Sequence, residues 1–165
     1  MKPNINLRWK DKIFLAIIAI ALISIGVERI FFHQQKNDPP QNHPGSVIVT
    51  INDTALKLEV SETPEEMLKG LSGMDSMDEN SGMLFVHQQP GQYEYVMRDM
   101  RFGLDFLFIS GNRVVDIAQN VPETFRGLIS GGTPYDEVIE VNAGWVARHE
   151  VKIGNEMKLL GAQDK

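Results

Sequence analysis

Cysteine is absent from this sequence of 165 residues. Without a thiol, the chain has no disulfide bond, no thiolate zinc site and no cysteine nucleophile. The histidines show no metal-binding spacing such as H-E-x-x-H, and there are only four of them: His33, His43, His87 and His149. We therefore predict no zinc site. The lack of cysteine is also compatible with a bacterial domain outside the cytoplasm.

Recognisable catalytic motifs are missing as well. No G-x-S-x-G sequence is present, and Ser130-Gly131-Gly132 is typical of a turn. An acidic loop carries oxygen ligands that would suit calcium, but their spacing differs from the EF-hand template: Asp75, Asp78, Glu79 and Asn80. We interpret this loop as solvated, and we predict no catalytic residue, no metal ligand and no cofactor.

The charge is divided unevenly along the chain. Residues 1–45 carry six Lys/Arg and three Asp/Glu, whereas residues 46–165 carry ten and nineteen, which gives net charges of +3 and −9. An acidic domain repels phosphate backbones, so nucleic acid is excluded as a predicted partner.

The one long apolar run lies near the N-terminus. Ile13 to Val27 contains no charged residue, and Ile30 to Phe32 extends the pattern to roughly 20 residues, the length that crosses a bilayer. The Ala-x-Ala triplet, Ala19 to Ala21, lies inside the run instead of after it. This favours an uncleaved signal anchor over residues 13–32, with a cleaved signal peptide as the alternative.

The flanks of this run predict the topology and the domain boundaries. Basic residues precede it, which places residues 1–12 in the cytoplasm and the rest of the chain outside. Residues 33–45 include three prolines and read as a solvated tether. Residues 46–161 then form a β-rich domain, and residues 162–165 a short tail. The predicted location is the cell membrane, with the domain periplasmic or on the cell surface.

Within residues 46–161 the pattern predicts short strands joined by turns. Alternating apolar residues on both sides of Asn52-Asp53 are typical of a β-hairpin. Thr63, Pro64 and Glu66 have the spacing of a capped, short helix. Further strands are expected at Gly82–His87, Tyr93–Met97, Leu104–Ile109, Val114–Ala118, Glu137–Val141 and Glu156–Leu160. The predicted fold class is all-β, a β-sandwich or partly open barrel of about seven to eight short strands with one short helix.

Two connections and one helical turn complete this prediction. A turn is expected from Gln88 to Gln92, and Ala143–His149 is expected to contain a helical turn. The connection from Val121 to Pro134 is long for a compact domain, and long ordered loops are often functional.

Charged residues interrupt the apolar pattern in the middle of the domain. Arg98 and Asp99 lie between two predicted strands, and Asp105 lies inside the second. A buried charge costs several kcal/mol unless it is paired. In one interpretation Arg98 forms a structural ion pair with Asp105 or Glu140. In the other, its guanidinium recognises a carboxylate or a pair of sugar hydroxyls.

The candidate ligand-binding residues are Arg98, Asp99, Asp105, Arg126, Tyr135 and Glu140. Aromatic residues provide either a carbohydrate-stacking surface or part of the core: Tyr93, Tyr95, Phe102, Phe125, Tyr135 and Trp145.

Ordered sequence blocks also carry a family resemblance: TPEEMLKGLSGM, GMLFV, VMRDMRFGLDFLFI, VIEVNAG and VKIGNEM. From Val47 to Leu160 the chain resembles the bacterial and archaeal family called domain of unknown function 192 (DUF192). The resemblance implies a compact β-rich domain, often placed behind a signal peptide or an anchor, from a family to which no general biochemical activity is assigned. This chain has Asp99 where the family usually has an amide and Gly103 where it usually has proline.

These observations predict an accessory or binding domain without catalysis, anchored at the membrane through residues 13–32. Its expected partner is a small polar ligand, an envelope polymer or another protein. One alternative is an envelope hydrolase that uses carboxylates near Asp99 and Asp105. Another is a structural subunit of a membrane complex.

Overall fold

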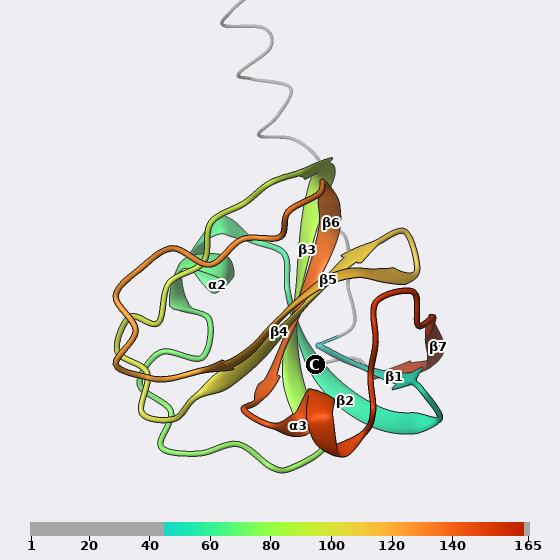
Figure 1. Ribbon diagram of the computed structural model, residues 1–165, viewed down its shortest axis with the longest axis horizontal. Coiled ribbons are helices and arrows are strands. Elements are labelled where there is room, and N and C mark those ends of the chain that lie inside the picture. Colours follow the sequence, from blue (N-terminus) through green and yellow to red (C-terminus); the bar gives the residue numbers. More distant parts are fainter. Residues whose placement is uncertain (1–44, 164–165) are drawn as a thin grey trace, which may run out of the picture. The chain divides into compact units, whose positions relative to one another are not determined.

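A computed structural model describes residues 45–163, which form one sheet of seven strands and two short helices (Figure 1). The strand order is β5-β4-β6-β3-β2-β1-β7, and the only parallel neighbours in this sheet are β2 and β3. The elements are β1 (Ser46–Ile51), β2 (Thr54–Ser61), α2 (Pro64–Lys69), β3 (Ser81–Gly91), β4 (Leu104–Ser110), β5 (Arg113–Val121), β6 (Tyr135–Asn142), α3 (Trp145–Arg148) and β7 (Met157–Gln163). The prediction of an all-β domain is confirmed.

The predicted membrane span, residues 13–32, lies outside the described residues, as do residues 1–12 and nearly all of the tether. Between residues 45 and 163, no helix combines the length and the apolar composition that crossing a bilayer requires.

The predicted hairpin is formed by β1 and β2. Asn52 and Asp53 both have positive φ, 47° and 62°, as a two-residue hairpin turn of type I′ requires. Asn and Asp tolerate this left-handed region better than other side chains, so the turn chemistry read from the sequence has a direct structural cause.

Helix α2 occupies the crossover between the parallel strands β2 and β3. Its predicted capping box is present, because the Thr63 side chain accepts the Glu66 N–H and the Glu66 carboxylate accepts the Thr63 N–H. Such a short helix is stabilised mainly by packing, and Met67 packs against the apolar residues of the sheet.

The sheet curls until its two edges meet. β5 and β7 are at opposite ends of the strand order, yet Arg113 forms a bridge with Glu156. Hydrogen bonds beside this bridge join Val114 N–H to the Asn155 carbonyl at 3.0 Å and Met157 N–H to the Asn112 carbonyl at 2.8 Å. The edge groups of the two outer strands are therefore partly satisfied within the domain.

Alternate residues of the strands form two apolar clusters, one on each face of the sheet. The inner cluster lies inside the curl, draws on β1 to β6 and includes Trp145 and Val146 of α3. The outer cluster lies on the opposite face of β3, β4 and β6, beneath α2 and the segment from Tyr93 to Phe102. Figure 1 shows α2 on one side of β3 and β6, with β1 and β7 on the other.

Two predictions around Pro90 are wrong. β3 continues to Gly91 instead of turning at Gln88, and Tyr93–Met97 is not a strand but an irregular segment with a single bridge, between Tyr95 and Ile129. Strand β3 can contain Pro90 because its pairing with β6 is interrupted between Val86 and Gly91, where a proline removes no ladder hydrogen bond. The other predicted strands, the helix at Pro64 and the helical turn near Trp145 are confirmed.

Candidate functional site

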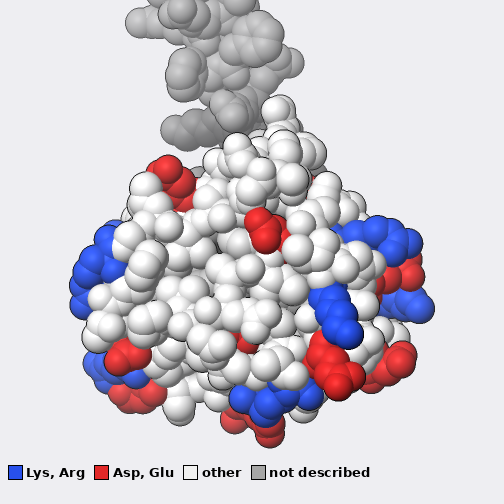
Figure 2. Space-filling view, in the orientation of Figure 1, with Lys and Arg blue, Asp and Glu red and all other residues white. Residues whose placement is uncertain are grey.

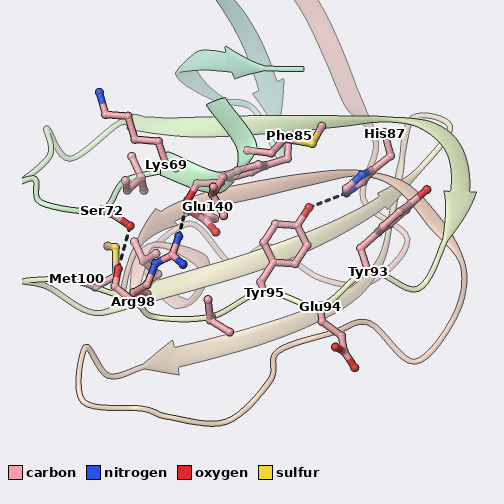
Figure 3. Close-up of a pocket in the computed structure, with 16 residues that line it drawn as sticks. Lys69, Ser72, Phe85, His87, Tyr93, Glu94, Tyr95, Arg98, Met100 and Glu140 are labelled. Atoms are coloured by element: carbon pink, nitrogen blue, oxygen red, sulfur yellow. Dashed lines mark hydrogen bonds between the residues drawn. The ribbon is translucent and has the colours of Figure 1, made fainter. Parts of the chain in front are cut away.

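A cavity of about 270 Å³ lies over the outer cluster. Its walls come from α2 and the turn after it, from β3, β4 and β6, and from the irregular segment between Tyr93 and Met100 (Figure 3). Its polar and charged lining residues are Lys69, Ser72, His87, Tyr93, Glu94, Tyr95, Arg98 and Glu140. We call it the Glu140 cavity.

Glu140 projects from the middle of the sheet. β6 lies between β3 and β4, where Glu140 is paired in register with Met83 and Phe106. Because side chains alternate along a strand, Glu140 shares the face of Val138, which belongs to the outer cluster. Apolar side chains therefore surround Glu140, and the residue as a whole is 6% exposed.

No hydrogen bond or salt bridge reaches the Glu140 carboxyl group from any of residues 45–163. Burial raises the pKa of Glu140 to about 8, so the group is largely protonated at neutral pH and can donate a hydrogen bond. A buried polar group without a partner is destabilising, and such groups are uncommon in folded proteins. Its position at the wall of an open cavity makes it available to a ligand.

Arg98 lines the same cavity and is held by backbone contacts. Its Nη2 donates to the Leu68 carbonyl at 2.8 Å, and the Ser72 Oγ donates to the Arg98 carbonyl at 2.9 Å. The first contact satisfies a carbonyl in the last turn of α2. A guanidinium has five N–H donors, so this bond leaves others free to face the cavity.

The predicted ion pair of Arg98 with Asp105 or Glu140 is not formed among the described residues. Asp105 is fully buried, and its two oxygens accept the N–H groups of Asn120 at 2.6 Å and Val146 at 2.9 Å. This carboxylate is therefore already satisfied by backbone N–H groups of β5 and α3.

A histidine–tyrosine pair occupies another part of the cavity wall. His87 Nε2 lies 2.7 Å from Tyr95 Oη in a hydrogen bond, and the His87 ring stacks on Tyr93 with 3.5 Å between centroids. Burial lowers the pKa of His87 and raises the pKa of Tyr95. Both side chains are therefore uncharged at neutral pH.

A second hollow, of about 230 Å³, is lined by Arg98 and its neighbours and by part of the long connection. It brings together three of the six candidate residues, Arg98, Asp99 and Arg126, with Phe125 of the long connection. The bridge between Tyr95 and Ile129 ties this connection to the segment. Among residues 45–163, no cluster of three or more His, Asp or Glu side chains is arranged to hold a metal ion.

Comparison with known proteins places this architecture in a family. The family model DUF192, described as an uncharacterized ACR, matches residues 47–159. The chain belongs to the DUF192 family. This family is one of unknown function, and a search of curated proteins found no match.

Two solved structures share the fold of this DUF192 domain. One, from Sinorhizobium meliloti 1021, is described as a candidate transcription regulator; it has 24% sequence identity and a TM-score of 0.68 over 71% of this chain and 95% of that chain. The other is a protein of unknown function from Novosphingobium aromaticivorans DSM 12444, with 27% identity and a TM-score of 0.65 over 74% and 94% of the two chains.

The DUF192 domain separates the six predicted site residues into three groups. Glu140 and Arg98 line the Glu140 cavity, and Arg98, Asp99 and Arg126 line the second hollow. The remaining two, Asp105 and Tyr135, are fully buried and line neither. The Tyr135 hydroxyl accepts the Tyr93 N–H at 3.0 Å and donates to the Tyr93 carbonyl, so its polar group is satisfied internally.

The backbone conformation at position 99 favours aspartate or asparagine. The φ of Asp99 is +54°, and its carbonyl accepts the Gly73 N–H at 3.0 Å. Asp and Asn both tolerate left-handed backbone, so the amide expected in the resemblance and the acid present here suit the same conformation.

Sequence reasoning did not select His87 as a site residue, and it named Tyr95 only among six aromatic residues of either a stacking surface or the core. A signal for His87 was present, because Met83, Phe85 and His87 alternate along β3 and place a polar ring at the end of an apolar face. The hydrogen bond between Tyr95 and His87 had no sequence signal, since Tyr95 lies in the irregular segment and not in the strand predicted there.

Proposed function

We propose that this DUF192 chain is a non-enzymatic binding domain that holds a small polar ligand in the Glu140 cavity. The observation that carries the proposal is the Glu140 carboxyl group itself, which is buried, unpartnered among the described residues and open to a cavity. Evolution rarely retains such a group at the centre of a sheet without a use, because an apolar side chain there would be more stable.

The size of the cavity favours a small molecule over a folded partner. A volume of about 270 Å³ is near the lower end of the range for small-molecule sites, roughly 300 to 1,000 Å³. Such a volume can enclose a metabolite or one end of a longer chain. A hydrolase is not favoured, because Asp105, one of its two expected carboxylates, is sealed and already accepts two backbone hydrogen bonds.

Binding is tested by measuring the thermal unfolding of residues 45–165 with a panel of amines, carboxylates, amino acids, sugars and polyols. At least one compound class should raise the melting temperature of the wild type and leave that of Glu140→Leu unchanged, because leucine removes the polar partner. A folded wild-type domain that no class stabilises would overturn the binding function.

The proposal also includes display outside the cytoplasm on an anchor formed by residues 13–32. Its support is the apolar run with basic residues on the N-terminal side. A fusion at Lys165 to a reporter that is active only in the periplasm should be active. Activity of a cytoplasm-only reporter at the same position would reverse the proposed topology.

A further inference from the structure

We infer that the Glu140 cavity recognises a zwitterion of the amino-acid type, with its ammonium group at Glu140 and its carboxylate at Arg98. This inference rests on the proposed binding function and adds the chemical class of the ligand. It derives from one acidic and one basic side chain in one cavity, neither of which forms a salt bridge within residues 45–163.

Glu140 requires a partner that supplies hydrogen-bond donors in an apolar surrounding. An ammonium group has three donors, and its charge offsets the desolvation of an ionised carboxylate. Aromatic rings line the same cavity, with Phe85 and Tyr95 packed edge to face at 5.3 Å. Ring faces near a carboxylate are favourable surroundings for an ammonium ion.

Arg98 makes a simple cation a poor ligand and supplies the second contact. A guanidinium binds a carboxylate through two parallel N–H bonds, and Arg98 forms no salt bridge with any described residue. The other charged lining groups are directed elsewhere, since Figure 3 shows the Lys69 ammonium and the Glu94 carboxylate pointing away from the remaining lining side chains. Glu140 and Arg98 thus define the charge pattern that a ligand meets.

The rest of the lining suits an apolar side chain. Leu68 and Val96 line the cavity while remaining 67% and 51% exposed. Exposed apolar residues at a cavity lose unfavourable contact with water when an apolar group covers them. A zwitterion with an aliphatic or aromatic side chain therefore complements the cavity better than glycine.

The direct test measures binding of L-leucine and L-phenylalanine by titration calorimetry at pH 7.5. Each amino acid is compared with its two half-molecules: isoamylamine and 4-methylpentanoate for leucine, phenethylamine and 3-phenylpropanoate for phenylalanine. At least one amino acid should bind, and each of its half-molecules at least about tenfold more weakly, because each lacks one charge-assisted contact.

Two variants and two matched controls assign the contacts. Glu140→Gln and Arg98→Lys should each weaken amino-acid binding at least about tenfold, since the first removes the anion and the second the bidentate fork. Glu137→Gln changes another partly buried carboxyl group of β6 that lies outside the cavity. Arg101→Ala removes an exposed arginine that pairs with Asp75. Both controls should bind within about twofold of the wild type.

The dependence of affinity on pH separates an ammonium ligand from a neutral one. Between pH 7 and 8 an ammonium group must displace the proton of Glu140, so affinity should rise with pH. A neutral acceptor bonded to protonated Glu140 would show falling affinity. The other titratable groups that line the cavity are Lys69, His87, Tyr93, Glu94, Tyr95 and Arg98; burial lowers the pKa of His87 and raises that of Tyr95, so neither titrates in this interval.

Each failure has a distinct meaning. An amine alone that binds as tightly as its amino acid, or unchanged binding in Arg98→Lys and Arg98→Ala, would overturn the role of Arg98 and with it the zwitterion. Binding of sugars or polyols without any amino acid would overturn the ligand class and leave the binding function intact. Absence of binding by every compound class would overturn both.

Discussion

Glu140 and Arg98 line one cavity, yet within the described part of the chain they form no salt bridge with each other. Arg98 instead donates to the Leu68 carbonyl, and Glu140 faces apolar neighbours. A direct pair would satisfy both groups within the protein. Its absence leaves one acidic and one basic group available, and this separation is the basis of the proposed binding function.

The first prediction concerns Glu140 and stability. Its folded pKa is raised from 4.5 to about 8, so the folded state binds more protons than the unfolded state between these values, and stability should fall as pH rises through this window. Glu140→Gln should therefore be more stable than the wild type at pH 8, on the order of 2–4 kcal/mol, with a smaller difference near pH 5. Urea unfolding at several pH values measures this difference.

A constant difference between the two proteins across pH 5–8 would contradict this prediction. Glu137→Gln is the control for strand β6, because burial also raises the pKa of Glu137, to about 7, and one of its oxygens is buried without a partner. Glu137→Gln should also be more stable than the wild type at high pH, and this difference should develop over a narrower range, from about pH 4.5 to pH 7.

Asp105 has a structural role, in contrast to Glu140. Asp105→Ala should destabilise the domain by about 3 kcal/mol or more, because the N–H groups of Asn120 and of the buried Val146 lose the carboxylate that accepts them. Asp99→Asn is the matched control, since Asp99 is exposed and asparagine tolerates its left-handed backbone; its effect should stay within about 0.5 kcal/mol. Chemical unfolding measures the free energy of unfolding of both variants. An Asp105→Ala protein as stable as the wild type would refute the structural role of Asp105.

His87 should remain neutral at physiological pH. Burial lowers its pKa below the ordinary value of 6.5, and the stacked Tyr93 ring contributes to that burial. Tyr93→Ala should move the pKa back toward 6.5, whereas Tyr93→Phe keeps the ring and should keep the low value. A nitrogen NMR titration of the imidazole measures the His87 pKa in the wild type, in Tyr93→Ala and in Tyr93→Phe. A wild-type pKa at or above 6.5 would be inconsistent with the packing.

Gly82 is required where β3 packs closely on β6. A Cβ atom there would lie 2.5 Å from the Glu140 carbonyl oxygen and 2.8 Å from Leu58 Cδ2, and the backbone oxygen cannot move without breaking the sheet. Gly82→Ala should cost about 2–3 kcal/mol. Gly161→Ala in β7 meets no atom within 4 Å and should be nearly neutral. Similar melting temperatures for the two variants would show that the strands separate easily at Gly82.

Much of the fold was predictable because its signals are local. The Asn52-Asp53 turn, the capping box at Thr63 and the alternating strands each depend on residues near in sequence. The prediction at Pro90 failed because β3 tolerates a proline there only where its pairing with β6 is interrupted. Strand β6 lies more than forty residues away, so no local sequence pattern indicates this interruption.

The candidate site was only partly predictable. Charged residues within an apolar pattern identified Glu140, Arg98 and Asp105, but the sequence did not separate the unpartnered Glu140 from the satisfied Asp105. That difference depends on backbone N–H groups at Asn120 and Val146, which tertiary folding brings to Asp105. The pairing of His87 with Tyr95 likewise depends on where the irregular segment crosses β3.

The most direct test of this account is the pKa of Glu140, measured by carbon NMR of the side-chain carboxyl groups of labelled glutamates, with Glu140→Gln to assign the signal. The free domain should show a midpoint of about 8, and a bound amino acid should shift it below 7, because an ammonium group stabilises the ionised form. A midpoint near 4.5 in the free domain would contradict the account, since it would mean that Arg98 or water already satisfies the carboxylate.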